Sequence, residues 1–440
     1  MLELSDGAKK ALELLHKHGH EAYIVGGSVR DMLMGIEAND FDITTSATPD
    51  EMKLAFAGYT VIETGIKHGT LTFLYKKEPI EVTTYRIDGD YKDNRHPESV
   101  EFTKNLNNDL SRRDFTMNAL VYNEREGIVD LFGGQNDINN KVIKAIGDPE
   151  IRFREDALRI LRGVRFASAL GFEIEEKTKD AMVKCAHLLH NVSAERINVE
   201  ISKLLLGKNV KKVLLDHYEI IGEILPEIKE MHGFSQNSKY HVYDILEHTA
   251  VAIENIPPVL HLRLTMLLHD TGKIRTYTED ENGNGHFYGH NRVSAKIAER
   301  FLNQYRYDND TKEKVLKLVE IHDAPIDFDK VFIKKRMNRI GKDLFFDLLK
   351  VKRADNLAQN PEYLWITKLN EMEKMANEIA EENCFTLQSL DISGNDLIAL
   401  GLKGKEIGDT LNELLNEVIE EKLLNEKEAL IKKAKEIFRQ

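Results

Sequence analysis

The stretch that decides the fold is YIVGGSVRD, residues 23–31, which DFDI follows at residues 40–43. Residues 23–25 are typical of a short buried strand, and the two glycines after them allow the backbone to approach a ligand before a helix that opens at Ser28. The free N–H groups at the start of a helix attract phosphate. The sequence therefore predicts a phosphate-binding strand, turn and helix near the amino terminus.

Asp40 and Asp42 flank Phe41 in a segment that we expect to be an extended strand. Alternate side chains of a strand share a face, so the two carboxylates would project together while Phe41 enters the core. Such a pair favours a bound cation, and two magnesium ions could bracket the attacking and leaving oxygens of a phosphoryl transfer. A surface turn rich in Asp and Asn would show the same short pattern, so both interpretations stay open here.

A small mixed sheet is expected around this motif. An amphipathic helix is predicted at residues 4–18, and strands are predicted at residues 59–63, 70–75 and 80–85. Helices that alternate with strands indicate a mixed sheet. If the strand that carries Glu81 lies beside Asp42, the Glu81 carboxylate can complete a catalytic, metal-binding triad; a solvent-facing Glu81 is the alternative.

Length and composition indicate an α+β protein of several domains. The 440 residues exceed one ordinary core and suggest about three domains. Helical periodicity dominates after residue 148, and the two cysteines indicate neither disulfides nor a cysteine zinc site. We expect a cytoplasmic protein without membrane contact, because the sequence shows no long apolar run and no signal peptide.

Charge restricts where nucleic acid could bind. The formal net charge of -13 argues against uniform coating by nucleic acid, because phosphate requires locally positive surface. Residues 151–212 hold more basic than acidic side chains, against the trend of the whole chain. We therefore expect any nucleic-acid contact in that segment.

Two arginine-rich segments suit a nucleotide. SRRDFTMNAL, residues 111–120, presents adjacent guanidinium groups that fit triphosphate oxygens, although a solvated basic turn would look the same. In REDALRILRGVRF, residues 154–166, the polar side chains recur every third residue and share a helix face: Asp156, Arg159, Arg162 and Arg165. A carboxylate beside a guanidinium can offer acceptor and donor groups to a base edge, whereas a row of surface ion pairs is the alternative.

Five motifs in order resemble one enzyme family. GGxVRD, DxD, RRDFTxNA, EDxxR and SAERI span residues 22–206 and closely resemble the class II tRNA nucleotidyltransferases, the CCA-adding enzymes, and their poly(A) polymerase relatives. The resemblance implies a polymerase-beta-like head followed by helical domains. We expect a nucleotidyltransferase head at 1–148, a neck for nucleotide bases and RNA at 149–230, a helical metal domain at 231–360 and a tRNA-binding tail at 361–440.

The resemblance also implies roles for individual residues. Asp40 and Asp42 would bind Mg²⁺, and the nucleotide phosphates would contact Gly26, Gly27, Arg30 and Arg112. Asp156 and Arg159 would recognise the base, while Arg162 and Arg165 would support the nucleotide and the acceptor end. Residues 88–97 would belong to a loop linked with the switch from C to A addition.

A second pattern of histidines and aspartates occupies the middle of the chain. It includes LLHDTGK at residues 267–273 and resembles the HD phosphohydrolase superfamily. The metal ligands of that superfamily map here to His248, His269, Asp270 and Asp355, and the extra histidines of its two-metal members map to His290 and His322. Imidazole suits transition metals such as Mn, Fe, Ni or Co. Asp323 stands where a second consecutive histidine would follow His322, so the sequence leaves a second metal ion open.

These patterns favour template-independent addition of CTP and ATP to the tRNA 3' end, by a two-magnesium transfer that releases pyrophosphate. A-only addition or poly(A) synthesis is the nearest alternative, since the same motifs serve it. A metal-dependent phosphohydrolase with an RNA-holding head and a non-enzymatic RNA-binding protein are the others. No pattern indicates a protein partner.

Overall fold

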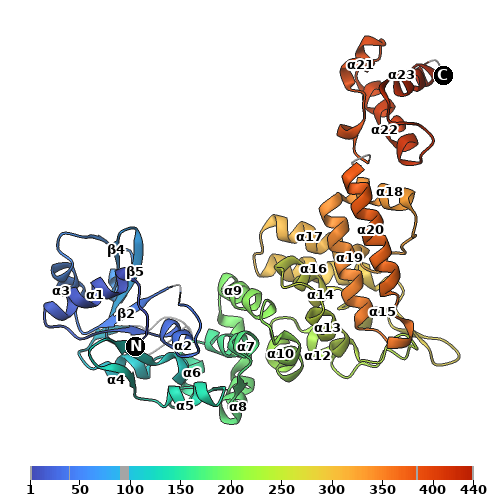
Figure 1. The fold of residues 1–440 in the computed structure, drawn as a ribbon. Coiled ribbons are helices and arrows are strands. Elements are labelled where there is room, and N and C mark those ends of the chain that lie inside the picture. The colour runs from blue at the N-terminus through green and yellow to red at the C-terminus, as the bar shows by residue number, and fades with distance from the viewer. Residues whose placement is uncertain (1, 39, 90–98, 383–384, 439–440) are drawn as a thin grey trace. The chain divides into compact units, whose positions relative to one another are not determined.

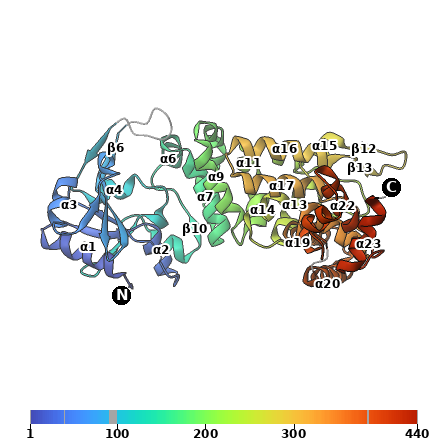
Figure 2. The same cartoon turned by 90° about the horizontal axis from the view of Figure 1, so that it is seen from above.

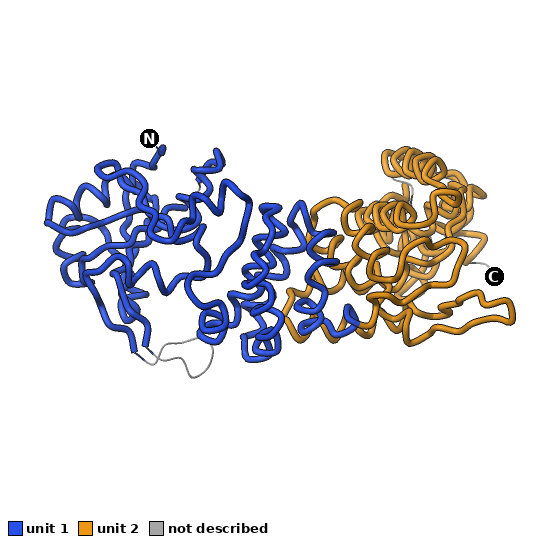
Figure 3. Tube along the Cα trace, turned by 90° about the horizontal axis from the view of Figure 1, so that it is seen from below, with its two compact units in different colours: residues 1–229 blue, residues 230–440 orange. Residues whose placement is uncertain are grey.

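The structure, a computed structural model, describes residues 2–38, 40–89, 99–382 and 385–438 (Figure 1). The chain divides into two compact units, residues 1–229 and 230–440 (Figure 3). The four domains predicted from the sequence stay a prediction, and the predicted boundary after residue 230 lies one residue from the boundary between the units. Among the described residues, no helix combines the length and the apolar character needed to cross a bilayer.

Unit 1 begins with a seven-stranded mixed sheet in the order β3-β4-β5-β2-β1-β8-β9. Its strands are β1 Ala22–Val25, β2 Asp42–Thr45, β3 Thr60–Ile62, β4 Thr70–Tyr75, β5 Glu78–Thr84, β8 Leu120–Asn123 and β9 Gly127–Asp130. β2 runs parallel to β5, and the other neighbours are antiparallel. The predicted strand at 70–75 is confirmed as β4. The strands predicted at 59–63 and 80–85 overlap β3 and β5, and only their ends differ.

β2 begins later than the sequence suggested. Asp42 is its first residue, so Asp40 and Phe41 precede the strand, although Phe41 is buried as expected. The neighbouring strand β1 ends at Val25, directly opposite Asp42, because Gly26 turns the chain away with a φ of 83°. Residues 40 and 41 therefore have no partner on that edge.

Short helices pack on this sheet. They are α1 Asp6–Lys17, α2 Gly27–Leu33, α3 Pro49–Ala55, α4 Leu106–Ser111 and α5 Gly134–Asn139. α1 contacts β4 and β5 and also α3, whereas α2 contacts β1 and β8 (Figure 1). The capping box of Thr48 and Glu51 begins α3 by satisfying free N–H groups. A further ladder pairs β6 Arg86–Asp88 with β7 Val100–Phe102.

Helices complete unit 1. They are α6 Pro149–Glu155, α7 Leu158–Leu170, α8 Glu176–Cys185, α9 Ala194–Leu205, α10 Val210–Asp216 and α11 Tyr218–Ile221. Gly163 brings α7 close to its neighbours, because a Cβ there would lie 2.2 Å from Met182 Cε and 3.0 Å from Phe115 Cζ. The parallel strands β10 Val142–Ile143 and β11 Glu173–Ile174 also join the two parts of the unit. The polar face of α7 is thereby held beside the sheet.

In the described residues of unit 2, the regular elements are helices and one hairpin, β12 Thr278–Glu279 with β13 Gly285–His286 (Figure 2). Its first helices are α13 Ile245–Glu254, α14 Leu260–Leu268, α15 Lys273–Thr276, α16 His290–Gln304, α17 Asn309–Ile321, α18 Lys330–Ile340 and α19 Lys342–Leu357. α20 Ile366–Glu382, α21 Gly394–Ala399, α22 Lys405–Ile419 and α23 Lys427–Phe438 follow. One apolar core runs through α18 to α23. The predicted α+β fold is confirmed.

Candidate functional site

A cleft of about 730 Å³ lies in unit 1, between the sheet and the helices after residue 148. Asp40 and Asp42 line it, together with every residue that the sequence assigned to the nucleotide: Gly26, Gly27, Arg30, Arg112, Asp156, Arg159, Arg162 and Arg165. Residues that are separated by up to 139 positions thus face one space of nucleotide size.

The carboxylates of Asp40 and Asp42 line the sheet end of the cleft, with that of Glu81 beside them. β2 and β5 place Asp42 directly opposite Glu81, so both side chains lie on the same face. Loss of hydration, then the charges of Glu81 and Asp40, raise the pKa of Asp42, and Arg113 offsets part of this rise. Mutually repelling oxygen donors fit a hard divalent cation. Glu81 stands beside the cleft and is not among its described lining residues.

Arg159 and Arg162 are each fixed by groups of the segment that carries Arg112. Arg159 is 8% exposed and donates from Nη2 to the Arg112 carbonyl at 2.7 Å and from Nη1 to Glu155 at 2.8 Å. Arg162 donates from Nε to Asp114 Oδ2 at 2.8 Å. Burial would raise the pKa of Asp114, but Arg162 and other donors lower it to about 2. α7 is therefore bonded to the sheet-bearing part of the unit.

Asp156 lies in extended backbone just before α7, not on the helix face as predicted, and has two protein partners. Its Oδ1 accepts from the N–H of Leu158 at 3.1 Å, and its Oδ2 accepts from Arg196 Nη2 at 2.8 Å. Arg196 stands on α9 and also lines the cleft. Arg196 belongs to the SAERI motif, which carried no predicted role for it, and its spacing from Asp156 gives no sign that the two side chains meet.

Phe166 gathers three arginines at the cleft. The guanidinium carbons of Arg165, Arg30 and Arg162 lie 3.9, 5.0 and 5.5 Å from its ring centroid. Attraction to the ring helps to hold like charges near one another. An aromatic residue on an amphipathic helix resembles core packing, so the sequence did not single it out. Residues 90–97 of the predicted C-to-A loop lie outside the described residues.

Three known protein families match successive parts of this chain. The family described as Poly A polymerase head domain matches residues 22–144, that of the probable RNA- and SrmB-binding site of polymerase A matches 171–231, and that of tRNA nucleotidyltransferase domain 2 matches 287–434. The CCA-adding enzyme of Bacillus cytotoxicus is 35% identical over 425 residues, which cover 95% of each chain. This chain belongs to the CCA-adding enzyme family. The resemblance drawn from the five motifs is confirmed.

Solved CCA-adding enzymes share the fold. The crystal structure of the Bacillus stearothermophilus CCA-adding enzyme in complex with CTP matches with a TM-score of 0.72 at 28% identity, covering 98% of this chain and 97% of that one. The Thermotoga maritima CCA-adding enzyme complexed with tRNA matches with a TM-score of 0.62 at 20% identity, covering 98% and 94%, which shows the fold alone. Membership of this nucleotidyltransferase family implies a divalent metal ion, and the carboxylates around Asp42 provide suitable donors.

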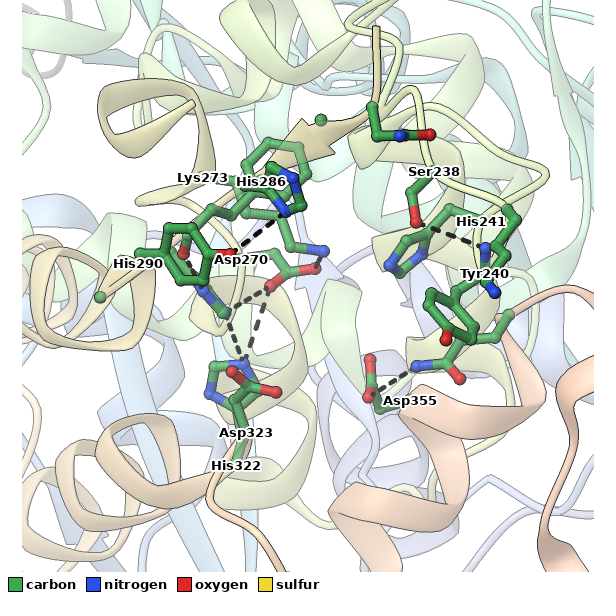
Figure 4. A pocket seen from close by; sticks show the side chains of 17 residues that line it. Ser238, Tyr240, His241, Asp270, Lys273, His286, His290, His322, Asp323 and Asp355 are labelled. Carbon is green, nitrogen blue, oxygen red and sulfur yellow. Dashed lines mark hydrogen bonds and ion pairs between the residues drawn. The ribbon is translucent and has the colours of Figure 1, made fainter. Parts of the chain in front are cut away.

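Unit 2 of this CCA-adding enzyme family member holds a second cluster of potential ligands, of which Figure 4 labels Asp270, His290, His322 and Asp355. One group comprises His248, His269, Asp270 and Asp355, and a second comprises Asp270, His290 and His322; within each group the ligand atoms lie within 4.8 Å of one another. The side chains come from α13, the end of α14, the start of α16, the end of α17, and α19. The structure thus brings together all six residues that the sequence assigned to this site.

The histidines are oriented alike by the backbone. Each Nδ1 lies 2.7 to 3.0 Å from a carbonyl oxygen: His248 at Ala358, His269 at Met266, His290 at Phe287 and His322 at Val319. A carbonyl can only accept, so each Nδ1 carries a proton and each ring turns its Nε2 toward the cluster, where a neutral ring offers a lone pair. Nε2 atoms then face each other at 3.4 Å in one group and 3.1 Å in the other.

Two facing Nε2 lone pairs repel each other unless a proton or a metal ion lies between them. Burial lowers the pKa of His269, but Asp270 and Asp355 outweigh this and raise it to about 10. Burial would raise the pKa of both carboxylates, but His269 and Lys273 hold that of Asp270, and His248 and His269 that of Asp355, well below the ordinary value. The donor set therefore fits one or two metal ions that share Asp270. None of the three matching family descriptions names an HD domain.

Proposed function

We propose that this chain adds CTP and ATP to the 3' end of tRNA, without a nucleic-acid template, in the cleft of unit 1. The observation that carries the proposal is that one cleft gathers the carboxylates of β2, the glycine turn before α2 and the arginines of α7. Family membership across 95% of the chain supports it. Because tRNA and nucleoside triphosphates are cytoplasmic, we place the protein there.

In this reaction the terminal ribose oxygen bonds to the α-phosphorus, and the bond from that phosphorus to the β-phosphate bridging oxygen breaks. The hydroxyl proton goes to solvent and pyrophosphate leaves. Asp40 and Asp42, with Glu81 beside them, would hold magnesium, which would neutralise the phosphate charge. The chain positions the reactants: phosphates at Gly26, Gly27, Arg30 and Arg112, and the acceptor end at Arg162 and Arg165.

Base recognition falls to Asp156 and Arg159 in this proposal. Both already hold protein partners, which fix their orientation before the nucleotide binds. A carboxylate oxygen can accept a second hydrogen bond, and a guanidinium group has five N–H donors. The pair can thus present acceptor and donor groups to a base edge without leaving its partners.

The test uses tRNA transcripts that end before the first C, the second C and the final A, each incubated with one nucleotide at a time and then sequenced. The expected products are C, C and A in that order. Asp42→Ala should abolish incorporation while tRNA binding persists, and Asp50→Ala, a change at a residue whose side chain is 93% exposed, should behave as wild type. Incorporation of A alone would assign the A-adding reaction instead, and full turnover by Asp42→Ala would refute the active site.

The histidine and aspartate cluster of unit 2, whose two groups share Asp270, favours a second activity. The cluster opens into a pocket of about 560 Å³. We propose that it is a metal-dependent phosphohydrolase. A manganese, iron, nickel or cobalt ion would supply Lewis-acid activation of water when bound. Phosphate release should survive Asp42→Ala and disappear in His269→Ala, and the same variant should lose bound metal in elemental analysis. Metal content and phosphate release that are unchanged in His269→Ala would refute it.

A further inference from the structure

Three guanidinium groups of the cleft in unit 1 lie against the ring of one phenylalanine, Phe166. Their carbons stand 3.9 Å from the ring centroid for Arg165, 5.0 Å for Arg30 and 5.5 Å for Arg162. We call Arg30, Arg162 and Arg165 the arginine cluster. All three line the cleft, as does Phe166 itself. Phe166 is only 4% exposed, so little of its ring is left for a nucleotide base to stack on.

Each guanidinium group of the arginine cluster is also held by a carboxylate of its own. The carboxylate oxygen lies 2.9, 2.8 or 2.6 Å from Nε of its arginine: Asp31 at Arg30, Asp114 at Arg162 and Glu200 at Arg165. A bond to one edge of a planar group leaves that group free to swing about the edge. An aromatic ring packed against its face restricts this motion. The carboxylates and the ring therefore fix different movements of the same side chains.

The ring joins two parts of the cleft. Arg30 stands on α2, which packs on the sheet, whereas Arg162, Arg165 and Phe166 stand on α7. Phe166 is itself fixed by the ring of Phe115, which is fully buried and meets it edge-on at 6.0 Å and 88°. In the proposed reaction Arg30 contacts the phosphates, and the other two arginines contact the acceptor end. Phe166 thus lies between the groups that hold the two reactants.

The chemistry of the ring suits this place. Like charges gathered at one side chain repel each other, and salt removes this repulsion only in part, because the screening length under physiological conditions is about 8 Å. The negative face of an aromatic ring attracts cations and opposes their separation. A leucine could fill similar space with apolar atoms, but it offers no such face. The arginine cluster therefore depends on the aromatic character of Phe166.

We propose that Phe166 is a positioning residue for nucleotidyl transfer, and that its ring holds the arginine cluster in the arrangement that aligns the triphosphate with the acceptor ribose. The inference rests on the transfer reaction proposed for this cleft. A displacement of about 1 Å can cost roughly a hundredfold in rate. A side chain that touches neither reacting atom can therefore still set the rate.

The test replaces Phe166, in the full chain, by phenylalanine analogues that carry progressively more ring fluorines. Fluorine withdraws electron density from the ring face with little change in ring size, so the attraction for cations weakens step by step. At saturating CTP, with tRNA that ends before the first C, kcat should fall at each step, to about one tenth for the most fluorinated ring. A kcat that does not follow the fluorine content would overturn the proposal, because a merely structural ring responds to size and not to charge.

Phe153 is the matched control for the fluorine series. It is fully buried on α6, and no cation lies over its ring among the residues that the structure describes. The same analogues at position 153 should leave kcat unchanged. An equal fall in kcat at both positions would show a general effect of fluorine on the core and would also overturn the proposal.

A double-mutant cycle asks whether Phe166 acts through the arginine cluster. Phe166→Leu removes the ring face, and Arg165→Gln removes the charge nearest to it. If the ring acts by holding that charge, the two losses overlap, and the double variant should keep about threefold more kcat than the product of the single effects predicts. Losses in kcat that simply multiply would contradict the proposal.

Binding separates a failure of this inference from a failure of the transfer reaction. CTP without tRNA has no acceptor, so its Kd is measured in the absence of turnover. The Kd should rise about threefold along the fluorine series at position 166, because Arg30 loses part of its support. Such a rise in a protein that adds neither C nor A would refute the transfer reaction while supporting the hold on the arginine cluster. Normal addition with kcat and Kd unchanged along the series would refute the role of Phe166 alone.

Discussion

The Thr44 hydroxyl donates a 2.9 Å hydrogen bond to Asp109 Oδ2 and so connects the strand of Asp42 to two arginines of the cleft. Asp109 is fully buried and accepts from Arg112 Nε and Nη2 at 3.0 and 2.8 Å, while Arg113 lies at 3.5 Å. Burial would raise the pKa of Asp109, but these arginines hold it below the ordinary value. This single carboxylate fixes the arginines relative to the catalytic strand.

Thr44→Val should therefore slow the reaction by misaligning Asp42 with the triphosphate. We expect kcat to fall about fivefold to tenfold with little change in nucleotide affinity. The free energy of unfolding should fall by about 1–2 kcal/mol, because Asp109 loses a hydrogen-bond partner. Single-turnover kinetics and urea unfolding measure the two effects. Thr45→Val is the matched control: Thr45 is equally buried but donates to the Glu21 carbonyl at 2.6 Å. Equal kinetic losses in both variants would contradict this role for Thr44.

Asp114 should make stability depend on acid pH. Its pKa is depressed to about 2 in the folded chain, so its contribution is present above the unfolded value near 3.8 and is lost as pH falls through the folded value. Nearly two units correspond to about 2 kcal/mol. The difference in unfolding free energy between wild type and Asp114→Asn should shrink from pH 5 toward pH 2. A difference that stays constant over this range would rule out the ion pair with Arg162 as its source.

Arg196→Ala should weaken nucleotide selection through Asp156, although Arg196 itself has no assigned contact with the base. Asp156 would lose the partner that fixes Oδ2, so we expect discrimination of CTP and ATP against GTP and UTP to fall about tenfold, close to the effect of Arg159→Ala. Ratios of kcat/KM measure it. Arg196→Lys should recover part of the selectivity, and Arg154→Ala, on the exposed part of α6, should not change it. Selectivity that is intact in both Arg196 variants would assign Arg196 to folding alone.

Removal of metal should destabilise unit 2. Without a cation the Nε2 atoms of His290 and His322 face each other at 3.1 Å, so chelation should lower Tm and added manganese or nickel should restore it. His248→Ala should lower the metal content and shrink this shift. His187→Ala, which changes an exposed histidine of unit 1, is the control. A Tm that does not respond to chelation, in a protein shown to hold metal, would count against a structural contribution of the site.

The sequence by itself determined the local features of this protein. Apolar triplets and paired glycines specified the strand and turn before α2, and a three-residue spacing placed Arg159, Arg162 and Arg165 on one helix face, although Asp156 lies in extended backbone just before that helix. The order of five motifs indicated the family. Such features depend on residues that lie a few positions apart in the chain, because the periods of helices and strands relate side chains over that range.

Only the tertiary structure decided which distant groups meet. The register of β2 against β5 set Glu81 opposite Asp42, and the packing of α9 brought Arg196 to Asp156. Spacing along the chain cannot encode these contacts, because long-range pairing depends on how whole elements pack. The inward lone pairs of the histidines arose likewise, since each ring is turned by a backbone carbonyl whose position the fold fixes.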